Sequence, residues 1–254
     1  MQVKSIKEIE SMLLEKKQLS ATELKVLQED ERKGVQVLLK RFLRRQEKEK
    51  ALQEQYNRMM AYENKCFSRG LNLVAGIDEA GRGPLAGPVV AAAVILNPDQ
   101  PIIGLNDSKQ LTKAQRKILV EQIKEHALSI GVGIVSAKEI DDLNIYQASK
   151  LAMEKAVQAL DMTPDALLID AMKINTPIPQ VSIIKGDARS VSIAAASIIA
   201  KETRDEMMEE LNRKYPGYDF HQHMGYGTKA HLEAIRRLGP CPEHRLSFAP
   251  FRTG

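Results

Sequence analysis

The sequence predicts an α/β domain, in which helices flank a mixed β-sheet, preceded by an N-terminal helical extension. Beyond residue 70, short runs of Val, Ile, Leu and Ala alternate with segments of helical periodicity, a pattern typical of layered α/β domains. Before residue 70, the good helix formers Lys, Glu, Gln, Leu and Arg dominate. A length of 254 residues is enough for one large domain and an appendage. We therefore divide the chain into an extension, residues 1–70, and a domain, residues 71–254.

The extension is expected to form a small helical hairpin or bundle. Residues 1–68 contain no Pro and one Gly, Gly34. Ser20 stands three residues before Glu23, which is the spacing of a capping box at a helix N-terminus. Leu and Val recur between residues 24 and 43 as an interrupted apolar stripe, which suits a helix with one buried face.

Positive charge is concentrated in this extension. Residues 1–70 hold 16 Lys or Arg against 11 Asp or Glu, so the whole positive excess of a chain with net charge +4 lies there. A basic helical surface favours contact with a polyanion. The candidate contacts are Lys40, Arg41, Arg44 and Arg45. A bundle that only stabilises the neighbouring domain is an equally good interpretation.

The domain is expected to contain five strands separated by helices. The strands are predicted at residues 73–77, 89–96, 128–135, 166–169 and 181–184. The continuous apolar run 89–96 indicates a strand buried on both faces. Helices are predicted at residues 111–126, 145–160, 190–214 and 228–238, with Thr112 and Asn144 as N-caps of the first two. The small apolar residues at the start of the third helix would let it lie flat on the sheet.

Composition excludes several classes of protein. No apolar stretch is long enough to span a bilayer, and the N-terminus lacks the apolar core of a signal peptide. Cys66 and Cys241 are too few for a disulfide framework and suit a reducing compartment. We expect a cytoplasmic protein that needs no membrane and acts as a monomer.

The most informative segment follows the first predicted strand. Asp78 and Glu79 stand at its end, and Gly81, Arg82 and Gly83 follow at once. Neighbouring side chains of a regular strand point to opposite faces, so the two carboxylates can share an ion only where the strand breaks. We expect a break there, because glycines permit it. A solvated acidic turn is the alternative.

Two further predicted strands also end near an acid. Asp170 closes the fourth strand, and Asp187 follows the fifth. Each could be no more than a turn or helix cap. Strand ends at one edge of an open sheet are, however, where α/β sites form. Carboxylates gathered there would repel one another, and hard divalent ions with oxygen ligands, Mg²⁺ or Mn²⁺, are their natural partners. Two such ions would serve an in-line phosphoryl displacement.

These motifs together resemble ribonuclease HII, the bacterial type 2 ribonuclease H. The resemblance rests on GIDEAGRGPLAGP at residues 76–88, DSK at 107–109, LLID at 167–170, KGD at 185–187, GYG at 225–227 and HRLSFAP at 244–250. The motifs occur in the family's order and cover about residues 71–250. The related ribonuclease HIII family has a different turn after its Asp-Glu pair and usually a larger N-terminal domain, so this turn is of the HII type.

The resemblance implies an RNase H-like fold, a five-stranded mixed sheet flanked by helices. It implies a metal-dependent endoribonuclease that cleaves the RNA strand of RNA–DNA hybrids and the 5′ side of single ribonucleotides in duplex DNA, leaving a 3′-hydroxyl and a 5′-phosphate. The family's four catalytic acids, which hold two metal ions, fall on Asp78, Glu79, Asp170 and Asp187. Its sensor of the ribose 2′-hydroxyl falls on Gly81, Arg82 and Gly83, its phosphate contacts on Ser108 and Lys109, and its sugar-stacking tyrosine on Tyr226.

Other interpretations remain open from the sequence alone. The chain could be a non-catalytic duplex-binding protein on the same scaffold, or another RNase H-like nuclease such as a junction resolvase or an exonuclease. The presence of all four of the family's catalytic acids argues against a non-catalytic protein. The turn that matches the family's 2′-hydroxyl sensor argues against another nuclease, which would not need one. The histidines between residues 221 and 244 lack the paired Cys-x-x-Cys arms of a structural zinc site, so we expect them to be partly buried and hydrogen-bonded.

Overall fold

The computed structural model describes residues 4–251 and divides the chain into two compact units, residues 1–55 and 56–254. The first unit contains α1 (Ile6–Glu15), α2 (Ala21–Gln28) and most of α3 (Lys33–Met59). Ser5 and Ser20 begin α1 and α2 with complete capping boxes, so the cap predicted at Ser20 is confirmed. Apolar side chains of the three helices form a small core of Ile9, Leu13, Leu27, Val35, Leu39 and Phe42.

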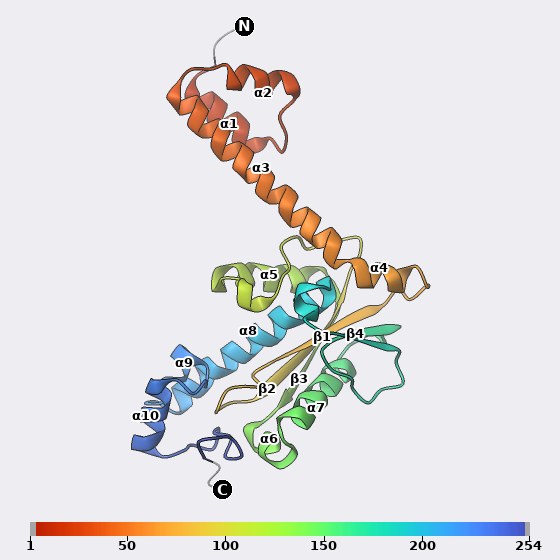
Figure 1. Cartoon of the computed structure of the whole chain (residues 1–254), viewed down its shortest axis with the longest axis vertical. Coiled ribbons are helices and arrows are strands. Elements are labelled where there is room, and N and C mark those ends of the chain that lie inside the picture. Colours follow the sequence, from red (N-terminus) through yellow and green to blue (C-terminus); the bar gives the residue numbers. More distant parts are fainter. Residues whose placement is uncertain (1–3, 252–254) are drawn as a thin grey trace. The chain divides into compact units, whose positions relative to one another are not determined.

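The second unit is the α/β domain shown in Figure 1. After the end of α3 and α4 (Ala61–Phe67), its elements are β1 (Val74–Ala80), β2 (Val89–Leu96), η1 (Ser108–Gln110), α5 (Lys113–His126), β3 (Ala127–Val135), α6 (Ala137–Leu143), α7 (Ile145–Gln158), β4 (Ala166–Asp170), β5 (Gln180–Ile183), η2 (Gly186–Ala188), α8 (Val191–Lys214), α9 (Phe220–His223) and α10 (Lys229–Leu238). No helix within residues 4–251 is long and apolar enough to cross a bilayer.

The predicted five-stranded mixed sheet is confirmed. Its strand order is β3-β2-β1-β4-β5. The pairs β1–β2 and β2–β3 are antiparallel, whereas β1–β4 and β4–β5 are parallel. Strand β1 therefore lies at the centre, with an antiparallel neighbour on one side and a parallel neighbour on the other. The expected caps Thr112 and Asn144 are also present at α5 and α7.

Helices cover both faces of the sheet. Ala92 and Val94 of β2 pack with α5 and α8, and the alternate residues Ala91 and Ala93 pack with α7. Because both faces are covered, β2 has a continuous apolar sequence rather than an alternating one. The prediction from residues 89–96 is confirmed in its bounds and in its burial.

Helix α6 was missed by the sequence prediction. It is only seven residues long, and it begins with a capping box between Ser136 and Glu139. The box is a readable signal, but a run this short has no convincing apolar periodicity. Helix α9, with four residues, was missed for the same reason.

Helix α8 lies directly against the backbone of β1, because β1 has a glycine at the crossing. A Cβ atom on Gly76 would stand 2.0 Å from the carbonyl carbon of Ser192. Neither backbone has room to move away, since both belong to the buried core. The close packing of α8 on β1 therefore depends on Gly76.

We expect Gly76→Ala to destabilise the domain by at least about 2 kcal/mol, because α8 must separate from β1. Urea unfolding followed by circular dichroism measures the change. Gly83→Ala is the control: its Cβ would stand 3.6 Å from Tyr226, an ordinary contact, so the effect should stay within about 0.5 kcal/mol. Equal unfolding midpoints for the two variants would contradict this account of the packing.

Candidate active site

Strand β1 continues through the acidic pair. Asp78 is paired with Ala92, Glu79 with Ala91 and Ala80 with Val90, all in the regular antiparallel ladder with β2. The predicted break after residue 77 is therefore wrong, and the turn begins only at Gly81. The strand persists because β2 satisfies its backbone up to the last residue. The two carboxylates consequently leave β1 on opposite faces of the sheet.

Asp78 points to the face of the sheet that α8 covers. Only 5% of its surface is exposed. Burial raises its pKa well above the ordinary value, and the charges of Glu79 and Asp170 raise it further; hydrogen bonds from the Ser197 hydroxyl and the Glu79 amide oppose the shift. Burial thus disfavours the charged form of Asp78, and a nearby cation would oppose this effect.

Glu79 is nearly as buried, and one of its oxygens has no partner. Arg82 lies 3.3 Å from Oε1, whereas the buried Oε2 makes no hydrogen bond. Burial is the main cause that raises its pKa from 4.5 to about 7; Arg82 lowers it and Asp170 raises it. An unpartnered buried carboxylate oxygen costs free energy, so this atom is suited to a ligand.

Asp170 and Asp187 lie beside these two acids. Asp170 ends β4, and its Oδ1 accepts a hydrogen bond of 2.6 Å from the amide of Gly186 at the start of η2. Asp187, in η2, is 9% exposed, and burial followed by the charges of Asp107 and Asp170 raises its pKa. The charge of Asp170 raises the pKa of each of the other three acids. The four predicted acids therefore form one electrostatic cluster.

The cluster is not a closed cage of ligands. Across residues 4–251, no three Asp, Glu, His or Cys side chains stand close enough together to hold an ion by themselves. The donors are nevertheless of the right kind, because carboxylate oxygens are the ligands that Mg²⁺ and Mn²⁺ prefer. The free Oε2 of Glu79 fits the same chemistry.

The glycine turn and the predicted sugar-stacking tyrosine lie side by side. A Cβ on Gly83 would stand 3.6 Å from the Tyr226 ring, and the Leu85 amide donates to the Gly225 carbonyl at 2.8 Å. Gly81 has a φ of +96°, a conformation that glycine adopts without strain. Tyr226 is 48% exposed, so its ring is available at the surface. Residues about 140 positions apart thus form one surface feature.

Ser108 and Lys109 differ in accessibility. Ser108 is buried, and its hydroxyl lies 3.0 Å from that of Ser197, the residue that also bonds Asp78. Lys109 is exposed: partial burial lowers the pKa of its ammonium, but the carboxylates of Asp107, Asp78 and Asp187 raise it, and the net shift is upward. The ammonium therefore lies within the field of the acidic cluster.

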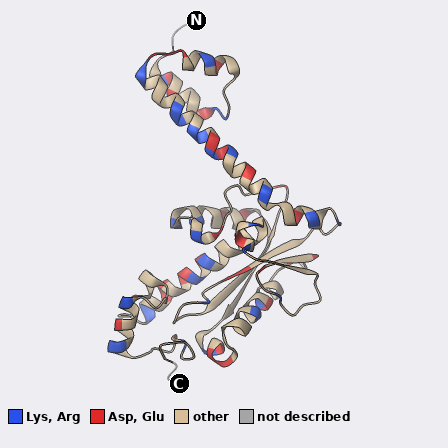
Figure 2. Ribbon diagram, in the orientation of Figure 1, with Lys and Arg blue, Asp and Glu red and all other residues tan. Residues whose placement is uncertain are grey.

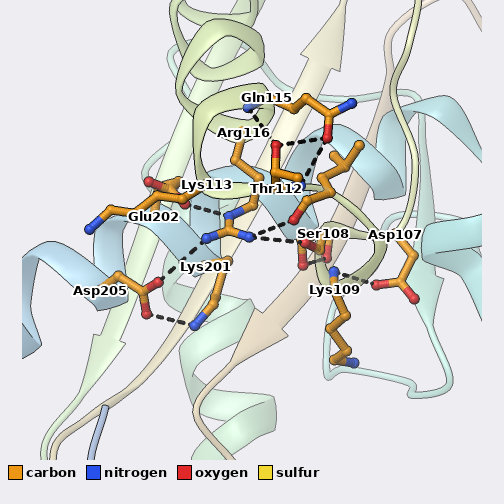
Figure 3. A network of polar contacts seen from close by, with 12 residues as sticks. Asp107, Ser108, Lys109, Thr112, Lys113, Gln115, Arg116, Lys201, Glu202 and Asp205 are labelled. Carbon is orange, nitrogen blue, oxygen red and sulfur yellow. Dashed lines mark hydrogen bonds and ion pairs between the residues drawn. The ribbon is translucent and has the colours of Figure 1, made fainter. Parts of the chain in front are cut away.

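A polar network that the sequence did not reveal holds the 108–111 turn on α8. Arg116 of α5 donates from Nε to Glu202 at 2.5 Å and from Nη1 to the Leu111 carbonyl at 2.9 Å (Figure 3). Asp205 lies 4.0 Å from Arg116 and accepts from Lys201 at 2.7 Å. The partners come from segments more than 80 residues apart, so no local pattern could have indicated them.

Comparison with known proteins identifies the family. The sequence profile described as "Ribonuclease HII" matches residues 75–251, and that of the "Ribonuclease HII N-terminal domain" matches residues 5–67. The chain belongs to the ribonuclease HII family. Ribonuclease HII of Geobacillus thermodenitrificans is 57% identical over 248 residues, which cover 98% of this chain and 96% of the relative. Membership makes the protein a nuclease of the ribonuclease H type.

Solved structures of ribonuclease HII proteins share the fold. The ribonuclease H2 of Pyrococcus horikoshii superposes with a TM-score of 0.59 at 28% identity, over 70% of this chain and 94% of that one. The ribonuclease HII of Archaeoglobus fulgidus, solved in a complex with PCNA, gives a TM-score of 0.55 at 27% identity, over 65% and 87%. The predicted RNase H-like fold is thereby confirmed.

The raised pKa of Glu79 predicts a stability that depends on pH when divalent ions are removed. The folded protein keeps a proton up to about pH 7 that the unfolded chain releases near 4.5. The free energy of unfolding should therefore fall as the pH rises through this window. Glu79→Gln should remove this loss and be more stable than the wild type at pH 8, by roughly 1–3 kcal/mol.

Urea unfolding with a chelator at intervals from pH 5 to pH 8 measures this effect. Glu121→Gln is the matched control, since the Glu121 side chain is 77% exposed and should leave the pH dependence unchanged. Parallel pH profiles for wild type and Glu79→Gln would show that burial of this carboxylate is not destabilising.

Proposed function

We propose that this ribonuclease HII family member is a metal-dependent endoribonuclease for duplexes that contain ribonucleotides. It cleaves the RNA strand of RNA–DNA hybrids and the 5′ side of single ribonucleotides in duplex DNA, leaving a 3′-hydroxyl and a 5′-phosphate. In this proposal residues 71–254 form the catalytic domain, which works as a cytoplasmic monomer, and residues 1–70 form a basic helical extension. The observation that carries it is the buried cluster of Asp78, Glu79, Asp170 and Asp187.

The acids would hold two divalent ions, Mg²⁺ or Mn²⁺. Bound there, such ions supply an activated water and stabilise the leaving oxygen of the phosphodiester. Burial favours this role, because carboxylates with raised pKa values gain more from a cation than solvated ones do. Ser197, through its hydrogen bond to Asp78, and Gly186, through its bond to Asp170, keep these two side chains oriented.

Recognition of the ribonucleotide would fall to the surface beside the cluster. In the turn of Gly81, Arg82 and Gly83, Gly81 is buried and the other two are exposed, so the backbone at Gly83 reaches the surface without a side chain in the way. A 2′-hydroxyl both donates and accepts hydrogen bonds. The exposed ring of Tyr226, next to Gly83, would stack on the neighbouring sugar. Lys109 would contact a phosphate, because its positive charge lies at the surface close to the acidic cluster. Ser108, being buried, would act through the backbone of its turn.

The decisive experiment uses labelled duplex DNA with one ribonucleotide. Wild type with Mg²⁺ or Mn²⁺ should cut just 5′ of the ribonucleotide, and a chelator should stop it. Asp78→Asn should lower the cleavage rate by at least about a thousandfold with binding largely intact, because it removes a ligand and not a surface contact. Glu121→Gln, an exposed acid far from β1 in sequence, is the control. Tight binding by wild type without cutting under either metal would make this a duplex-binding protein instead.

We further propose that the N-terminal unit adds non-specific duplex affinity. At 3.6 residues per turn, Lys40, Arg41, Arg44 and Lys48 share one side of α3, opposite the buried Val35, Leu39 and Phe42. All four are exposed, and Figure 2 shows Lys and Arg spread along this helix. Arg45, another predicted contact, instead donates to the Leu13 and Lys16 carbonyls. The proposed duplex contacts on α3 therefore include Lys48 and exclude Arg45.

Replacing Lys40, Arg41 and Arg44 together by Gln should weaken binding to duplex DNA and flatten its salt dependence. Because the slope of log K against log salt is about −0.9 for each phosphate contact, three lost contacts make this negative slope shallower by roughly two to three. Anisotropy titrations between about 50 and 200 mM salt measure it. The same substitutions at Lys7, Lys25 and Lys33 remove equal charge elsewhere in the unit and serve as control. An unchanged slope in the first variant would leave the unit a stabilising bundle.

A further inference from the structure

Arg245 is a fully buried cation that forms no ion pair with the acids of residues 4–251, although the charge of Asp141 acts on it. It is 0% exposed, and its hydrogen bonds within residues 4–251 all go to backbone carbonyls. Nη2 donates to Gly81 at 2.6 Å, and Nη1 donates to Arg82 at 3.0 Å. Nε and Nη2 both donate to Gly87, at 2.9 and 2.8 Å, and Nη2 also reaches Pro88 at 3.1 Å. One guanidinium thus joins both ends of the 81–88 turn.

A second buried arginine lies beside it. Arg204 of α8 donates to the carbonyls of Pro88 at 2.9 Å, Ala86 at 3.0 Å and Met224 at 3.0 Å. Burial, together with the neighbouring charge of Arg204, lowers the pKa of Arg245 to about 9, although Asp141 opposes the shift; burial lowers the pKa of Arg204 to about 10. Burying two like charges together is costly, so tight carbonyl coordination must compensate. Arg204 connects the 81–88 turn to the loop that precedes Tyr226.

The residue before Arg245 supports the tyrosine itself. His244 Nδ1 accepts from the Cys241 amide at 2.9 Å, so its proton is on Nε2 and points to Nε2 of His231, 3.1 Å away. His231 must then carry its own proton on Nδ1, which donates to the Tyr226 carbonyl at 2.9 Å. This tautomer assignment follows from the hydrogen-bond pattern. His244 therefore supports Tyr226 through His231, and Arg245 supports the 81–88 turn. Tyr226 and this turn are the two parts of the proposed recognition surface.

We propose that Arg245 is a positioning residue for ribonucleotide selectivity. It touches no substrate. By fixing the carbonyls of Gly81 and Arg82, it sets the turn at the distance from Tyr226 at which a ribose with a 2′-hydroxyl fits. The inference rests on the proposed function, because it assigns a determinant to that same recognition surface. A lysine keeps the charge but has one nitrogen and cannot bridge carbonyls at both ends of the turn.

The test measures binding of two duplexes of equal sequence, one all DNA and one with a single ribonucleotide, at one salt concentration. Asp78→Asn serves as the parent protein so that cleavage does not interfere. Selectivity is the dissociation constant for the all-DNA duplex divided by that for the duplex with the ribonucleotide. Adding Arg245→Lys should lower this ratio by about tenfold or more, since small misplacements of a positioned group cost on this order. Affinity for all-DNA duplex should change by less than about twofold, because the phosphate contacts stay.

Arg237→Lys is the matched control. Arg237 also donates to a carbonyl, that of Gly217 at 3.3 Å, but it is exposed and does not touch the turn. Its selectivity ratio should equal that of the parent. Loss of affinity for both duplexes in equal proportion, or an unchanged ratio, in folded Arg245→Lys would overturn the proposal.

A second variant keeps the test decisive if Arg245→Lys does not fold. The Phe248 ring lies 5.2 Å from the Arg245 guanidinium carbon. Phe248→Leu removes the ring that packs on the guanidinium, which lets Arg245 shift from its carbonyl acceptors while its charge is kept. The selectivity ratio should therefore fall by a smaller factor than in Arg245→Lys, and an unchanged ratio would overturn the proposal. If the parent protein bound both duplexes equally, the proposed substrate would be refuted. If the parent is selective, an unchanged ratio in the variants refutes only the role of Arg245.

Discussion

The burial of negative charge on the central strand is the constraint on which the rest of the domain depends. Strand β1 is paired with β4 up to Ile77 and with β2 through Ala80, and the side chains of its Asp78 and Glu79 are largely buried. Water cannot solvate them fully, so their pKa values rise and the metal-free fold carries a cost. Cations bound to these carboxylates would offset this free-energy cost.

The loops beside this strand are organised by the opposite charge. Arg204 and Arg245 occupy the interior of the 81–88 turn and bind carbonyls, so the turn needs no regular secondary structure to be ordered. Glycines make this possible, since a Cβ on Gly81 would stand 2.1 Å from Arg204 Nε. The glycines therefore have two effects: Gly83 leaves the outer surface of the turn without a side chain, and Gly81 lets a guanidinium approach from inside. Substitution at Gly81 would disturb both.

The sequence predicted what depends on local pattern and missed what depends on partners far away. The run 89–96 identified β2 with its bounds, because burial on both faces leaves a continuous apolar signature. The motifs located the acids, the glycine turn and Tyr226. The course of β1 through Asp78 and Glu79 was missed, because it is fixed by pairing with Ala91 and Ala92 and not by the glycines that follow. Arg245 was unreadable because its acceptors are carbonyls some 160 residues away, which carry no sequence identity.

Helix α4 belongs to the same compact unit as the sheet, residues 56–254, and a buried carboxylate ties it to α8. Glu63 of α4 is 2% exposed, and its Oε1 accepts from the Ser190 hydroxyl at 2.5 Å and from the Ser192 amide at 3.0 Å. It lies at the N-terminus of α8, where a carboxylate is favoured by the helix dipole. The Ser190 hydroxyl in turn caps α8 by accepting from the Ile193 amide. Helix α4 therefore helps to anchor the helix that presents Ser197 to Asp78, although sequence composition groups it with the extension. A fragment that started at residue 71 would lack this anchor, whereas one that started at residue 56 would retain it.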